Sequence, residues 1–147
     1  MTSSELIQIA AGLIGSLCFG ILFNMRGKRL IAAAVGGLLS WGLFVVLSHI
    51  IFNEPINYFI VAAVISLYSE IMARILKTPA APVVTTSLIP LIPGGSLYYT
   101  MASAFEGSFN TFLEKAVSTL KLAGALALGI IVITATSQLL FRHVKQK

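Results

Sequence analysis

The chain has 147 residues, of which 57% are hydrophobic and only 10% are charged, with no aspartate. Soluble domains carry about 25% charged residues because a surface in water must be solvated, so this composition excludes an ordinary soluble domain and indicates lipid as the solvent. The formal net charge of +5 lies mainly between apolar runs, which is typical of a membrane topology signal and not of a nucleic-acid-binding surface.

Apolar runs long enough to cross a hydrocarbon core of about 30 Å recur along the chain. We predict about five transmembrane helices, at residues 6–23, 30–52, 56–76, 80–104 and 117–141. Asn24 follows the first helix and is interpreted as its C-cap. A polar loop over residues 105–115 precedes the last helix. No segment is long enough to act as a linker, so residues 1–147 are expected to form a single all-α transmembrane domain.

Lysine and arginine are distributed unevenly between the predicted loops. When alternate loops are assigned to opposite sides of the membrane, most of the cations fall on one side. They are Arg26, Lys28, Arg29, Arg74, Lys77, Arg142, Lys145 and Lys147. The other side receives Glu5, Glu54, Glu106, Glu114 and Lys115. Basic loops resist translocation. We therefore predict a multi-pass protein of a bacterial inner membrane with the N-terminus outside and the C-terminus in the cytoplasm.

Small residues recur at intervals of four in three of the predicted helices. They are Gly12, Ser16 and Gly20, then Ala32, Gly36 and Ser40, and then Ala125 and Gly129. Lipid provides little hydrophobic drive between helices, so close backbone approach over small side chains supplies the packing. We interpret these stripes as helix contacts within the chain; a transport path along one of them is the alternative.

The predicted fourth helix is interrupted by Pro90, Pro93, Gly94 and Gly95. Each proline removes a backbone donor and clashes with the preceding turn, and glycine permits backbone angles closed to other residues. We predict a helix broken near the middle of the span, with its second half starting near Ser96. Unpaired backbone groups at that depth require protein or a wet cavity around them, and the start of a half-helix suits a carboxylate.

The same segment supplies the predicted substrate-binding residues, which are Pro90, Pro93, Gly94, Gly95, Ser96, Tyr98 and Tyr99. The substrate carboxylate is expected near the amides of residues 95–97. Two alternatives remain open: a proline kink that only shapes packing, and a re-entrant hairpin that returns to its side of entry. The hairpin would carry the basic C-terminal tail outside, which the charge distribution opposes.

Three further charged residues fall within predicted helices. Glu70 and Arg74 are four residues apart and share a helix face. An acid inside the membrane is costly unless it is paired or faces water, so Glu70 is either the structural partner of Arg74 or a coupling or gating group. Lys121 either extends to the interface or attracts substrate. A membrane enzyme would need several His, Asp, Glu or Cys side chains clustered at membrane depth, and Glu70 is the one candidate. We therefore predict no enzyme, no metal site and no cofactor.

Several motifs occur together in order: Phe23-Asn24, Ala32–Ala34, Gly36, Trp41, Glu70–Arg74, Lys77–Ala80, Ile89–Gly95 and Tyr98. Together they resemble the small-subunit type of the threonine/serine exporter family, the YjjB-like proteins, over nearly the whole chain. The proline-rich run with the Glu–Arg helix is the more specific part. The resemblance implies export of threonine and serine, or of dicarboxylates such as succinate, together with a larger membrane subunit.

The predicted topology agrees with a second membrane subunit. A half with an odd number of spans ends on the side opposite its start, so two such halves joined in series are inverted relative to each other, as in many carriers. We therefore expect one subunit of a secondary transporter for small carboxylate metabolites, surrounded by lipid and without a nucleic-acid partner. A homo-oligomeric channel and a non-transporting assembly factor are the alternatives.

Overall fold

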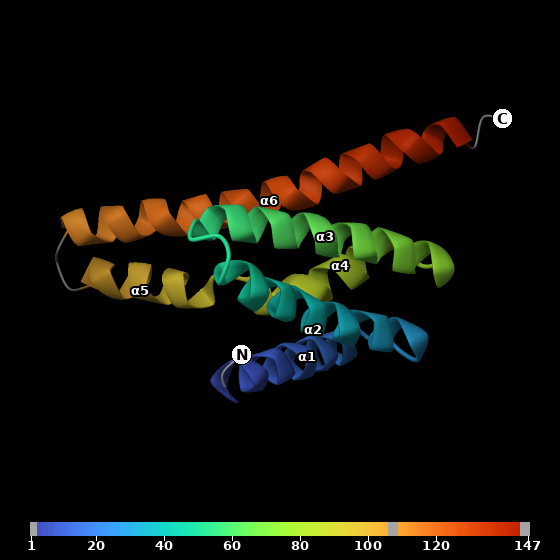
Figure 1. Ribbon diagram of the computed structural model, residues 1–147, viewed down its shortest axis with the longest axis horizontal. Coiled ribbons are helices and arrows are strands. Elements are labelled where there is room, and N and C mark those ends of the chain that lie inside the picture. Colours follow the sequence, from blue (N-terminus) through green and yellow to red (C-terminus); the bar gives the residue numbers. More distant parts are fainter. Residues whose placement is uncertain (1–2, 106–108, 145–147) are drawn as a thin grey trace.

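The computed structural model describes residues 3–105 and 109–144, and it describes side chains up to residue 139. Its elements are α1 (Ser3–Leu22), α2 (Lys28–Ser48), α3 (Glu54–Ile75), α4 (Ala80–Leu88), the 3-10 turn η1 (Ile89–Leu91), α5 (Gly94–Phe105) and α6 (Phe109–Val144) (Figure 1). Four helices are long and apolar enough to cross a membrane, and α4 with α5 makes a fifth if the bent pair is one span. The predicted all-α polytopic fold is confirmed.

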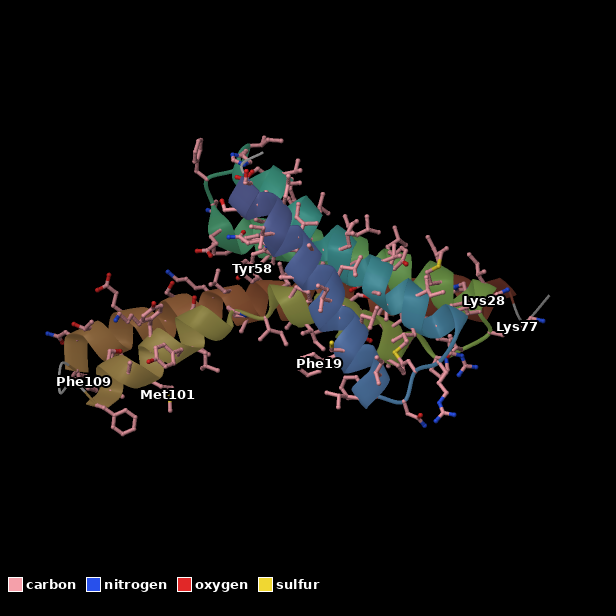
Figure 2. The ribbon with its side chains drawn as sticks, turned by 90° about the horizontal axis from the view of Figure 1, so that it is seen from below. Phe19, Lys28, Tyr58, Lys77, Met101 and Phe109 are labelled. Atoms are coloured by element: carbon pink, nitrogen blue, oxygen red, sulfur yellow. The ribbon has the colours of Figure 1, made fainter. Side chains whose placement is uncertain are left out.

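The helices form two main pairs (Figure 1), and α1 crosses the direction of α6 obliquely (Figure 2). α1 packs along α2 and α3 along α6, while α4 lies against α1, α2 and α3. α5 packs on the first part of α6, and this α5–α6 hairpin extends past the other helices (Figure 1). Figure 2 places Lys28 and Lys77 at one end of the molecule, here called the basic end, and Phe109 at the opposite end.

The start of α6 differs from the prediction. The sequence places the last helix at 117–141 and a polar loop at 105–115, whereas α6 begins at Phe109. The polar residues of this stretch form a helix because α5 packs on it: the hydroxyl groups of Thr100 and Thr119 are 2.9 Å apart, and Lys115 Nζ lies 5.9 Å from the centre of the Tyr99 ring. Hydropathy thus located the apolar part of the helix but not its first residue.

The helices approach one another through glycine and serine. A Cβ atom added to Gly37 in α2 would lie 2.8 Å from the carbonyl oxygen of Gly12 in α1, against the buried Ser16. A Cβ at Gly36 would lie 2.6 Å from Ser87 Cβ in α4, and one at Gly129 would lie 2.6 Å from a carbonyl oxygen of α3. The interpretation of the small-residue stripes as contacts within the chain is confirmed.

Two tight turns join helices at the basic end. Asn24 has a φ of 56°, and the amides of Asn24 and Met25 donate to Ile21 and Gly20. Lys77 has a φ of 50°, and the amide of Thr78 donates to Ala73 at 2.9 Å. Both are Schellman-type ends with a non-glycine residue in the left-handed position, so Asn24 caps α1 as predicted.

A matched pair of glycines in α2 tests the close packing. Gly37→Ala should lower the free energy of unfolding by about 1–3 kcal/mol, because the added methyl group overpacks a contact made partly by backbone. Gly42→Ala meets no atom within 4 Å and should be neutral or stabilising, since alanine is the better helix former. Thermal unfolding in detergent, followed by size-exclusion chromatography, provides the measurement. Equal losses in both variants would contradict the role of Gly37.

Candidate functional site

The predicted break in the fourth helix is present. α4 and α5 meet at an angle of 60°. They are separated by η1, Ile92 and Pro93, and Ile92 has extended angles of φ −60° and ψ 125°. Pro90 lines a hollow of about 250 Å³ together with Gly12 and Trp41. Gly12 is midway along α1, so the break lies level with the middle of that helix.

The chain continues in one overall direction through the break. α4 begins next to the turn that holds Lys77, and Met101 of α5 lies toward the opposite end, near Phe109 (Figure 2). A re-entrant hairpin would instead return residue 105 to the basic end. A bend of 60° is too small for such a reversal, so this geometry favours a broken crossing.

The amides at the start of α5 differ in two details from the prediction. α5 begins at Gly94 and not near Ser96. The amide of Leu97 donates to the carbonyl of Pro93 at 3.0 Å, so it is already used within the helix. The amide of Gly94 lies 2.6 Å from the carbonyl of Ile92. Gly95 and Ser96 therefore supply the first-turn amides that have no partner within a regular helix.

The glycine pair plays a different part from the one expected. Gly94 and Gly95 are helical, and the positive φ angles among the described residues belong to Asn24, Gly27 and Lys77. Neither glycine is thus required for an unusual backbone angle. A Cβ added to either would meet no atom within 4 Å. What the pair does is leave the backbone at the start of α5 uncovered.

The predicted binding residues form an open face and not an enclosed pocket of this chain. Tyr98 and Tyr99 are 69% and 61% exposed, and their rings are 5.5 Å apart in an edge-to-face contact. Pro93 and Ser96 are half-buried, and Gly94 and Gly95 are exposed. The structure therefore brings these residues together along one segment but leaves one side of them open.

Glu70 and Arg74 meet as predicted, in a charged cluster that includes a residue of α6. Arg74 Nη2 is 3.5 Å from Glu70 Oε2 and donates to Ser137 Oγ at 3.0 Å. Ser137 Oγ in turn donates to Glu70 Oε2 at 3.0 Å. A hydroxyl bridge thus joins the two charges and fixes α3 against α6.

A cavity of about 790 Å³ opens beside this cluster, between α3, α4 and α6, next to the turn that holds Lys77. Its polar lining consists of Ser66, Glu70, Arg74, Lys77, Thr78, Thr134 and Gln138. Ser66, Thr134 and Gln138 were not among the predicted site residues. Their signal was available, because Ser66 and Glu70 are four apart on α3, and Thr134 and Gln138 are four apart on α6.

Lys121 lies apart from both features. It is twelve residues after the start of α6, which corresponds to about 18 Å along the helix, and its side chain is exposed. Lys121 lies farther along its helix than predicted, because α6 begins at Phe109 and not at residue 117. Within residues 3–105 and 109–139, no group of three His, Cys, Asp or Glu side chains is placed to hold a metal ion.

These features define a polytopic membrane protein with a broken helix and a polar cavity at one end. Residues 8–136 match the family model described as threonine/serine exporter, ThrE. The chain belongs to the threonine/serine exporter family. Comparison with curated proteins and with solved structures gave no match.

The serine bridge gives a testable contribution to stability. Ser137→Ala removes two hydrogen bonds to charged groups from a buried position and should lower the free energy of unfolding by about 1.5–3 kcal/mol. Thr136→Ala is the control, because Thr136 is exposed and its hydroxyl donates to the Val132 carbonyl of its own helix. Both are compared by thermal unfolding in detergent. A loss no greater than that of the control would refute the bridge.

Proposed function

We propose that this chain is one subunit of a secondary transporter that exports small carboxylate metabolites, namely threonine and serine or dicarboxylates such as succinate. A larger membrane subunit of the same family is its proposed partner. The family assignment supports membrane transport, and the helix break supports a binding site for a carboxylate.

The observation that carries this proposal is the open face at the start of α5. Gly94, Gly95, Tyr98 and Tyr99 are exposed on this chain, yet a substrate at mid-depth must be screened from lipid on all sides. A second polypeptide that covers this face would complete the site. The substrate carboxylate is placed at the amides of Gly95 and Ser96, with Tyr98 and Tyr99 beside it.

The arrangement of charge supports a single orientation. Arg26, Lys28, Arg29 and Lys77 gather at the basic end, and this end is assigned to the cytoplasm of a bacterial inner membrane. The N-terminus is then outside and the C-terminus in the cytoplasm. A chain that inserts in one orientation cannot form an antiparallel homodimer, which is a further reason to propose a different subunit as the second half.

The first test of the proposal is partner dependence. Vesicles that contain only this chain should show no flux of L-threonine, L-serine or succinate, because the open face leaves the site incomplete. Adding the larger subunit should produce flux above the protein-free background. Radiolabelled uptake into proteoliposomes provides the measurement. Robust flux from the chain alone would contradict the two-subunit carrier and favour a homo-oligomeric channel.

The second test concerns the binding face. Gly95→Val should reduce flux in the two-subunit carrier at least tenfold, because a branched side chain would cover the amides at the start of α5. Folding should be retained, since a Cβ at Gly95 meets no atom within 4 Å. Gly124→Val is the matched control, because that exposed glycine in α6 is equally unobstructed but contributes no backbone to the start of α5. Normal transport by Gly95→Val with intact assembly would exclude this face as the binding site.

A further inference from the structure

The cavity between α3, α4 and α6 is separate from the helix break. Val84 is its lining residue closest in sequence to the break, six residues before Pro90, or about 9 Å along the helix. Gly94, Gly95 and Tyr98 contribute nothing to its lining. Its volume of about 790 Å³ is large enough for a small metabolite with water.

One side chain in this cavity has unsatisfied hydrogen-bonding capacity. Ser66 is only 2% exposed and lines the cavity, and its Oγ has no hydrogen-bond partner within the described part of the chain. The threonines of the helices behave differently: the hydroxyl groups of Thr100, Thr119 and Thr134 each donate to a carbonyl four residues earlier. A buried polar group without a partner costs about 1–3 kcal/mol, so a ligand or a water that bonds Ser66 is stabilised there.

Charges of both signs stand around the same cavity. Arg74 and Lys77 are cations one turn apart on α3 and its C-terminal turn, and Glu70 is the acid one turn before Arg74. The side chain of Glu70 is 19% exposed and that of Arg74 is 40% exposed, so both can be reached from the cavity. Cations hold a carboxylate and an acid holds an ammonium group. Together they match an α-amino acid, which carries both charges.

We propose that this cavity is a second binding site for the transported amino acid, on the cytoplasmic side of the helix break. Arg74 and Lys77 hold the α-carboxylate, Glu70 holds the ammonium group, and Ser66 hydrogen-bonds to the substrate at the inner wall. Substrate is loaded at the basic end before it reaches the amides of α5. This site rests on the proposed export function and adds to it a location and a set of residues.

Two serines on α3 provide a matched test. Ser66 and Ser69 are both buried and both lack a hydrogen-bond partner among the described residues, but Ser69 does not line the cavity. Ser66→Ala should raise the KM for L-threonine about five- to tenfold in the two-subunit carrier, as expected for one hydrogen bond. Ser69→Ala should change it less than twofold. Uptake of radiolabelled L-threonine into inside-out membrane vesicles gives both values.

A second measurement does not depend on turnover. The native thiol of Cys18 is exposed, so the background is Cys18→Ala, and Ser66→Cys is added to it. A membrane-impermeant methanethiosulfonate should label Ser66→Cys in inside-out vesicles, and 10-fold excess L-threonine over its KM should slow labelling about tenfold, as simple competition requires. Ser69→Cys is the control and should label slowly, because its side chain faces protein.

The outcomes separate the two proposals. Normal wild-type threonine flux with an unchanged KM in Ser66→Ala would overturn the cavity site and leave the export function standing. Labelling of Ser66→Cys that L-threonine does not slow would overturn it in the same way, as would protection by succinate but not by L-threonine. Absence of L-threonine flux with succinate flux retained would overturn the cavity site alone. Absence of flux of L-threonine, L-serine and succinate in the wild-type carrier would overturn the proposed function, and the cavity site with it.

Discussion

The close approach of helix backbones over glycine and serine is the constraint on which the rest of this structure depends. Lipid tails are as apolar as leucine, so helices in a bilayer gain little from burying apolar side chains against one another. Gly37 against Gly12 and Ser16, Gly36 against Ser87, and Gly129 against α3 remove the side chains that would hold the helices apart. α4 can then be enclosed by α1, α2 and α3, which gives the broken segment protein on several sides at mid-depth.

The broken segment and the charged cluster are two solutions to the same difficulty, which is to place polar groups where water is scarce. At the break, Pro93 accepts the hydrogen bond of Leu97, and only a short stretch of backbone is left for a ligand. At the basic end, the hydroxyl group of Ser137 hydrogen-bonds to both Glu70 and Arg74. Both charged side chains therefore have partners within the protein. The first arrangement presents dipoles and the second presents full charges, which under the proposed function suits them to different steps of binding a charged metabolite.

The sequence predicted the elements whose signals are local. The apolar runs gave the helices, the spacing of Gly12, Ser16 and Gly20 gave the packing face of α1, and Pro90 and Pro93 gave the break. It failed where distant segments decide the structure. The start of α6 depends on α5 packing against it, and the bridge through Ser137 joins residues 67 positions apart. The hydroxyl of Ser66 has no partner among the residues that the structure describes. This could not be predicted either, because a serine in a helix normally bonds its own backbone.

The length of α6 has a consequence for the surrounding bilayer. The part of it with described side chains, Phe109–Leu139, has 31 residues, whereas α1 has 20, which corresponds to about 46 Å against about 30 Å along the helix axes. Because the first turns of α6 carry polar and charged side chains, including Asn110, Glu114 and Lys115, α6 must tilt or extend beyond the hydrocarbon core that α1 matches. The mismatch costs a fraction of a kcal/mol per Å and is relieved by tilt, by local thickening or by association with another protein. Thin bilayers therefore raise the free energy of the free chain most at the α5–α6 hairpin. Lipids with shorter acyl chains should shift the equilibrium from the free chain toward its assemblies.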